Sequence, residues 1–355
     1  MIPGLARAAA RALTITALAG PLAAQGPAPT LAPAPLPEAL RVLEFRPGGI
    51  AWLDDSTAAV MDMDAAQLVV VHLRTGRMER YGRQGGGPGE FRLPLFMVAD
   101  PSGALVIDDM GARRLSEFAP NHTFVRAAPS PGATLRVLRW AGNVVRIAWI
   151  RFTPDSGGPT ITDVDLKTGR SRDRFRLFQR DSSIASPSAD MPGKSPFVAL
   201  AAGPGGEIVA GDPRTYRLVV FDSAGTPRLR FGRSGLKPAF RTAAELDAEL
   251  APMKGKIPAP QLRDTRDRLA KQPKPNFELT GLEMDRERRL WVATSRGALR
   301  TEIDIFSPAG AYLGMRSVPG RVRTFAVRLP WLLAVTERQG GDEDGSLGID
   351  LFRVR

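Results

Sequence analysis

The 355-residue sequence contains no cysteine and only two histidines, His72 and His122. The absence of cysteine excludes disulfide bonds, zinc ribbons, iron–sulfur clusters, thiol catalysis and a lipid-carrying N-terminal cysteine. Two histidines allow at most a sparse histidine metal site, and we predict no metal centre built on them. Beyond the N-terminal region no stretch approaches 18 uninterrupted apolar residues, so we expect no membrane-spanning helix in the mature chain.

The first 25 residues have the order of regions found in a secretory signal peptide. Arg7 and Arg11 precede a short apolar run, Ala12–Ala19, and small residues follow up to Gln25. This order predicts a signal peptide over residues 1–25, and the alternative is an amphipathic N-terminal helix of the mature fold. Prolines spaced by alanines then predict an extended tether over residues 26–38. We therefore expect an exported protein, either periplasmic or secreted.

Positive charge is in excess, with 49 lysines and arginines against 37 aspartates and glutamates and a formal net charge of +12. Removal of the two arginines of the predicted signal peptide leaves +10. Basic proteins often bind nucleic acid, but an exported protein rarely meets nucleic acid as its partner. The composition therefore does not predict a nucleic-acid-binding protein.

The chain repeats a unit of four short strands separated by glycine-containing turns. The clearest copy begins at Leu95, and others begin near Ile50, Leu135, Val198, Leu279 and Val322. A period of about 40–50 residues with four strands per unit is typical of a β-propeller, whereas two β-sandwiches would not explain it. The third strands of the units end near Leu73, Phe118, Leu166, Phe221, Phe306 and Val354, at intervals of 45, 48, 55, 85 and 48 residues. The sequence thus predicts an all-β, six-bladed propeller over residues 39–355.

The last unit lacks its fourth strand, and the long interval contains an insertion. Residues 41–45 precede the first unit with no other place in the count, so we predict that they complete the last blade and close the ring. The insertion, residues 233–276 between blades four and five, carries 10 basic and 5 acidic residues. Thr242 with Glu245 predicts a helix start, and a second helix is predicted around residues 261–270. The insertion is either a basic lid over the central channel or a hairpin that covers exposed core.

The segment Gly82–Phe91, GRQGGGPGEF, resembles the linker between blades of NHL-repeat propellers. Residues 103–109, with Arg113 and Phe118, are similar to the rest of that repeat, and GRSGLKPAF at 232–240 is a degenerate second linker. The resemblance implies a six-bladed propeller that is usually a binding platform and occasionally a lyase or hydrolase. A phosphate-binding loop is not predicted, because the region has no helix after the glycines; we expect a tight linker with glycines at positive φ.

Polar residues gather where the loops between strands two and three, and between strand four and the next blade, share one face of a propeller. Acids and arginines on one rim predict a site for a polar ligand. We predict no cofactor, and the one alternative is a calcium ion held by these acids. The alternative is pairing within each blade, such as Asp109 with Arg113, that only fixes the loops. Asp62, Asp108 and residues 342–344 belong to the same face. The candidate ligand-binding residues are Asp64, Asp109, Arg113, Asp212, Arg214, Tyr216 and Arg296.

No catalytic motif is present. The sequence has no Gly-x-Ser-x-Gly elbow, and neither histidine is placed for a serine triad. We therefore predict a monomeric, non-catalytic propeller that binds a small polar ligand, a peptide or a protein partner on its channel face. The alternative is a metal-assisted lyase or hydrolase of the propeller type.

Overall fold

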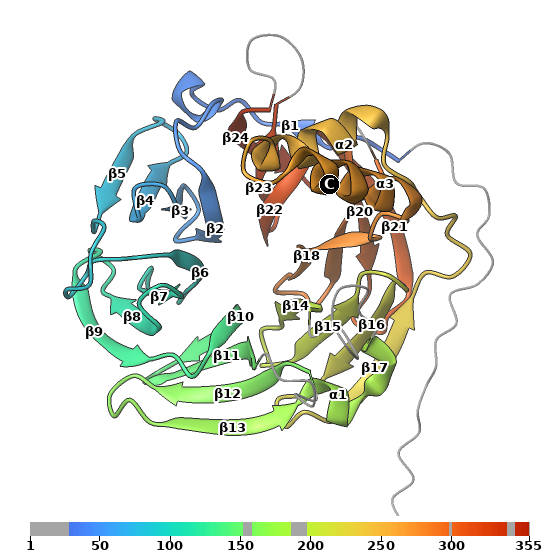
Figure 1. Ribbon diagram of the computed structural model, residues 1–355. Helices are drawn as coiled ribbons and strands as arrows, with labels where there is room; N and C mark the ends of the chain where they lie inside the picture. Colours follow the sequence, from blue (N-terminus) through green and yellow to red (C-terminus); the bar gives the residue numbers. More distant parts are fainter. Residues whose placement is uncertain (1–27, 152–157, 186–196, 298–299, 339–344, 355) are drawn as a thin grey trace, which may run out of the picture.

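The computed structural model describes residues 28–151, 158–185, 197–297, 300–338 and 345–354. The predicted signal peptide, residues 1–25, lies outside these ranges. Six four-stranded antiparallel sheets surround a central axis, and one edge strand of each lies innermost (Figure 1). The predicted all-β, six-bladed propeller is confirmed.

The blades follow one another in chain order, each running from its inner to its outer strand. Blade one contains β2 (Pro47–Trp52), β3 (Thr57–Asp62), β4 (Gln67–His72) and β5 (Met78–Tyr81). Blade two contains β6 (Pro94–Ala99), β7 (Leu105–Asp109), β8 (Arg114–Phe118) and β9 (Phe124–Pro129). Blade three contains β10 (Ala133–Ala141), β11 (Val144–Ile150), β12 (Thr160–Asp165) and β13 (Ser171–Arg176).

The second half of the ring has the same plan. Blade four contains β14 (Ala199–Ala202), β15 (Ile208–Asp212), β16 (Arg217–Phe221) and β17 (Pro227–Gly232). Blade five contains β18 (Phe277–Met284), β19 (Leu290–Thr294), β20 (Arg300–Phe306) and β21 (Tyr312–Pro319). Blade six contains β22 (Arg321–Arg328), β23 (Trp331–Glu337), β24 (Leu347–Arg353) and, as its outer strand, β1 (Ala32–Pro33).

The core is divided among the contacts between neighbouring blades. Six clusters of buried apolar side chains each join two adjacent blades. Successive side chains of a strand point to opposite faces of its sheet, so one strand packs against both the preceding and the following blade. In β7, Leu105 and Ile107 pack toward blade one, and Val106 packs toward blade three. Every blade is therefore needed to bury the next.

An N-terminal strand closes the last blade, as predicted, but the predicted residues are wrong. Ala32 and Pro33 pair with Arg353 and Phe352 of β24, whereas residues 41–45 form no strand. Proline suits this outermost position, since an edge strand has no partner for its missing N–H. The closing strand thus lies within the segment predicted to be a tether.

Residues 41–45 pack between two blades instead, which explains their apolar side chains at Leu43 and Phe45. Leu43 and Phe45 are buried between blades six and one, in a cluster that includes Leu333 of β23 and Val69 of β4. The Leu43 N–H donates to the carbonyl of Leu347 at 2.6 Å. A short 3₁₀ turn, η1 (Glu38–Leu40), leads into this segment. The segment seals the joint between the last and first blades without adding a strand.

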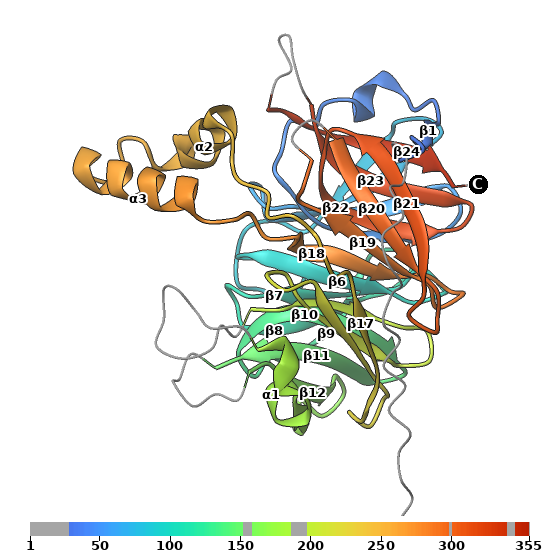
Figure 2. The same cartoon turned by 90° about the vertical axis from the view of Figure 1, so that its right-hand side faces the viewer.

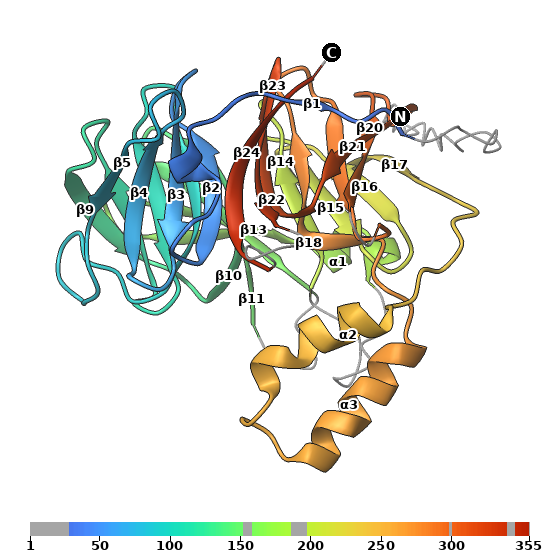
Figure 3. The ribbon, with the colours of Figure 1, turned by 90° about the horizontal axis from the view of Figure 1, so that it is seen from above.

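The insertion between β17 and β18 folds into two helices, as predicted. Thr242 caps α2 (Ala243–Leu250) in a capping box with Glu245; η3 (Ala251–Met253) and α3 (Ala259–Lys271) follow. The helices project from one face of the propeller (Figures 2 and 3) and overlie blades five and six in Figure 1. The remaining short helices, α1 (Leu177–Arg180) and η2 (Ser182–Ile184), follow β13.

Candidate functional site

The three candidate aspartates each bond to backbone or hydroxyl groups close to them. Asp109 accepts the N–H groups of Arg92 and Leu93 at 2.9 and 2.8 Å. Asp212 accepts the Arg214 N–H at 3.0 Å and the Thr215 hydroxyl at 2.6 Å. These contacts fix the connections between strands, so the two buried carboxylates have structural partners already.

Asp64 is the exposed member of the three. It accepts the Arg46 N–H at 2.9 Å and forms an ion pair with the Arg46 guanidinium at 3.3 Å. Its neighbour Asp62 accepts the N–H groups of Asp64 and Ala65. Each aspartate thus serves its own blade, and within the described ranges no three histidine or acidic side chains come together as metal ligands. The structure consequently offers the alternative, a calcium ion, no converging set of carboxylates in those ranges. Residues 342–344 lie outside the described residues.

The sequence suggested a pairing of Arg113 with Asp109 and did not single out Arg114. Arg113 is exposed in the turn after β7, with φ of 52°. The guanidinium of Arg114 instead donates to the carbonyls of Gly86, Gly87 and Glu90 in the glycine-rich linker. Gly82 and Gly89 have positive φ, as predicted for a tight linker. The carbonyls of this linker, which joins blades one and two, thus bind an arginine of blade two.

Tyr216 and Arg296 come together through Asp304, a residue that the sequence did not single out. Asp304 is fully buried in β20. It accepts hydrogen bonds from the Tyr216 hydroxyl at 2.5 Å, Arg233 at 2.8 Å, Arg296 at 3.1 Å and the Tyr312 hydroxyl at 3.2 Å. Burial, and then the charge of Asp304, raises the pKa of Tyr216 well above its usual value. This network joins blades four and five.

The Asp304 network leaves Tyr216 with only 1% of its surface exposed. Two of the candidate ligand-binding residues therefore lie in a buried polar core. The remaining one, Arg214, lies in the adjacent turn, where its carbonyl accepts the Asn276 side-chain amide at 3.0 Å. A sequence signal for Asp304 did exist: it is the charged residue inside the apolar run Ile303–Phe306.

A cavity of about 370 Å³, called here the insertion cavity, lies between α2 and the inner strands β18 and β22. The sequence predicted that the insertion emerges on the channel face, but it did not predict which residues line the cavity. Its charged lining comes in four ion pairs: Arg241–Glu249, Lys274–Glu245, Arg321–Glu278 and Arg323–Glu337.

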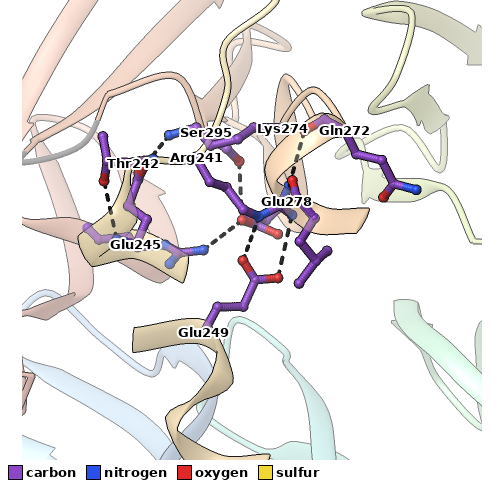
Figure 4. A network of polar contacts seen from close by, with 10 residues as sticks. Arg241, Thr242, Glu245, Glu249, Gln272, Lys274, Glu278 and Ser295 are labelled. Carbon is purple, nitrogen blue, oxygen red and sulfur yellow. Dashed lines mark hydrogen bonds and ion pairs between the residues drawn. The ribbon is translucent and has the colours of Figure 1, made fainter. Parts of the chain in front are cut away.

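The helix side of the insertion cavity is a network of polar contacts (Figure 4). Arg241 bonds to Glu249 at 2.6 Å, and Lys274 bonds to Glu245 at 2.7 Å. Burial alone would raise the pKa of Glu245, but hydrogen bonds from Lys274 and Thr242 outweigh it and lower the pKa. Glu278 accepts the Ser295 hydroxyl at 3.2 Å on the propeller side. Charged groups of both signs thus stand around one cavity.

Comparison with solved structures supports the fold. A DUF4221 family member from Bacteroides vulgatus matches with a TM-score of 0.56 and 11% identity, over 92% of this chain and 96% of that one. A Bacteroides fragilis protein named "Putative exported protein" matches with a TM-score of 0.51 and 12% identity, over 92% and 95%. The WD40 repeats of RRP9 match with a TM-score of 0.51 and 12% identity, over 93% and 99%.

These similarities are at the level of architecture, since identities of 11–12% carry the fold alone. No protein-family model matches the chain, and the search of curated proteins returns no match. In the described part of the chain, no helix is both long and apolar enough to span a bilayer.

Proposed function

We propose that this chain is an exported, non-catalytic binding protein whose ligand occupies the insertion cavity. The observation that carries the proposal is the double origin of the cavity wall. Glu245, Ala248 and Glu249 come from α2, whereas Thr280 and Val322 come from inner strands of the propeller. A ligand held there would touch both parts, which is how a helical insertion converts a generic propeller into a specific binding protein.

The lining favours a small zwitterionic ligand, such as a short peptide. Four cations and four carboxylates surround the cavity, so a ligand with an amino and a carboxylate group finds a partner of opposite charge for each. Arg321 and Glu278, on the propeller side, are the half-exposed pair, with 47% and 42% of their side chains accessible. They are the groups that a ligand can reach with the least loss of existing bonds.

Export is part of the same proposal. It is supported by the signal-peptide pattern of residues 1–25 and, at fold level, by the similarity to the Bacteroides fragilis protein named above. We also propose that the blades are of the NHL type, because the linker at 82–91 resembles that of NHL-repeat propellers.

The proposal is tested by screening tripeptides and free amino acids against the mature chain with thermal-shift measurements, followed by titration calorimetry. The Lys274 N–H donates to the Ala239 carbonyl at 2.7 Å, so residues 240–273 can be replaced by a two-glycine link between adjacent ends. We expect this excision to abolish peptide binding while the midpoint of thermal unfolding changes by only a few degrees.

A point variant refines the test. Arg321→Gln should weaken peptide binding at least tenfold, because a hydrogen bond to a charged group is worth about 1.5–3 kcal/mol. The matched control is Arg228→Gln, which removes a pair with Asp222 in the turn between strands three and four of blade four, on the opposite face. Peptide binding that survives the excision would contradict the proposed site. A metal that co-purifies and is needed for turnover would favour the lyase or hydrolase alternative.

A further inference from the structure

A second cavity, of about 290 Å³, lies in the central channel toward the turns between strands one and two. These turns are at the opposite ends of the inner strands from the insertion, so the channel cavity is separate from the insertion cavity. Residues from β2, β6, β10, β14, β18 and β22 all contribute to its lining. The ligand site proposed above does not use it.

Arginine dominates the charged lining of the channel cavity. Arg136 on β10 and Glu283 on β18 form an ion pair at 3.0 Å, with 23% and 25% of their side chains exposed. Arg286 and Arg328 also line the cavity. Arg328 pairs at 2.8 Å with Asp55, whose side chain is 90% exposed, and such a pair contributes little.

The acids of the lining are few and partly committed. Asp100 also lines the cavity, but its Oδ1 accepts the N–H and hydroxyl of Ser102 and the N–H of Ala104. Three guanidinium groups thus face two carboxylates, that of Asp100 and that of Glu283, which pairs with Arg136. An excess of guanidinium groups in a partly enclosed site favours carboxylate or phosphate ligands, which take two parallel N–H bonds from one arginine.

Hydroxyl groups on a ligand would also find partners. All six inner strands are edge strands of their sheets, and an edge strand presents unpaired N–H and C=O groups. One of these groups already has a local partner, since the Trp52 indole N–H donates to the Ala326 carbonyl at 3.2 Å. A cavity of this size accepts a molecule of several carbon atoms rather than a lone inorganic anion.

We propose that the channel cavity binds a small hydroxylated carboxylate, with Arg136, Arg286 and Arg328 as its cationic partners and Glu283 as an internal competitor for Arg136. When Glu283 is ionised it occupies the Arg136 guanidinium. When Glu283 is neutral, Arg136 is available to the carboxylate of the ligand. Binding is therefore coupled to the protonation of one named side chain.

The pH range of this coupling follows from the surroundings of Glu283. Burial raises its pKa to about 7, Arg136 opposes that rise, and Asp285 adds to it. The other charged groups of the cavity are Arg286 from the turn after β18 and Arg328 from β22. Asp100 comes from the turn after β6, whereas β2, β6 and β14 contribute apolar side chains. Because the neutral form predominates below pH 7, binding should be tighter at pH 6 than at pH 8.

The experiment titrates the mature chain with L-tartrate at pH 6 and pH 8 by calorimetry. Succinate tests the contribution of hydroxyls, threitol tests the need for charge, and sulfate tests the need for a carboxylate. We expect tartrate to bind most tightly and threitol not to bind. Arg136→Gln should weaken tartrate binding at pH 6 at least tenfold, and Glu283→Gln should bind at pH 8 as the wild type does at pH 6.

Two controls separate this proposal from folding effects and from the proposed function. Arg323→Gln, in the insertion cavity, should leave tartrate binding unchanged, and the chain with residues 240–273 excised should bind tartrate normally. If Arg136→Gln fails to fold, Glu283→Gln alone decides the question through its loss of pH dependence. No tartrate binding at pH 6, sulfate binding as tight as tartrate binding, or affinity unchanged in both variants would each overturn the proposal.

Discussion

Asp108, at the end of β7, is fully buried beside the apolar core between blades two and three. Its Oδ1 accepts the Thr134 hydroxyl at 2.9 Å, whereas its Oδ2 has no hydrogen-bond partner among the described residues. Burial therefore raises the pKa of Asp108 to about 7, helped by the neighbouring charge of Asp109. The folded protein binds a proton at Asp108 that the unfolded chain, with an ordinary aspartate pKa, releases.

The free energy of unfolding should consequently fall as pH rises from about 4 to 7, by at most about 4 kcal/mol from this group. Asp108→Asn keeps the shape of the side chain without the charge, so it should match the wild type near pH 4 and be more stable by a few kcal/mol at pH 8. Urea unfolding at both pH values measures the difference. The control is Asp55→Asn, at an exposed position, whose difference from the wild type in free energy of unfolding should be the same at both pH values. A difference for Asp108→Asn that does not change with pH would contradict the assignment.

At the scale of single residues, sequence patterns predicted which aspartates end strands but not what they bond. Asp109 and Asp212 end β7 and β15, as the repeat indicated. Their partners are backbone N–H groups and, for Asp212, the Thr215 hydroxyl. The direction of these groups depends on the turn geometry, which no spacing rule gives. The Tyr216–Asp304 contact joins residues 88 positions apart in different blades, so it appears only once the ring is closed.

At the scale of elements, local signals predicted the helices well and the closing strand poorly. The pattern of Thr242 with Glu245 identified the start of α2, because a capping box is a purely local arrangement. The closing strand has no such signal: two residues, one of them proline, pair with β24 only because the ring leaves that edge open. The more apolar residues 41–45 looked like a strand but are buried between blades instead.

The cap of α2 can be tested separately from the propeller. Thr242→Ala removes the side-chain acceptor of the Glu245 N–H, which typically costs about 1 kcal/mol. Because both helices project from the disk, this loss should accelerate hydrogen exchange of the α2 amides and leave the global unfolding midpoint nearly unchanged. Thr265→Ala in α3, where the hydroxyl donates to the Gln261 carbonyl within the helix, is the matched control. A lowered global midpoint would mean that α2 supports the blades.

At the scale of the whole molecule, the ring depends on every joint between blades, and the last joint is made by residues ahead of the first blade. Leu31 is 5% exposed and packs with Trp291, Phe325 and Phe352 of blades five and six. Its N–H donates to the Ser317 carbonyl of β21 at 2.8 Å. A free tether would make none of these contacts, so the segment from residue 28 onward belongs energetically to the propeller.

Leu31→Ala distinguishes an integral closing segment from a tether. Loss of a buried leucine costs about 2–5 kcal/mol, and here it also loosens the strand that covers the edge of β24. We expect a lower urea midpoint and, because an uncovered strand edge pairs with other chains, more aggregation. Val125→Ala, at a position 48% exposed, should change the free energy of unfolding by no more than about 0.5 kcal/mol. Equal stability of the two variants would mean that the ring closes without Leu31 and that residues 28–34 are dispensable.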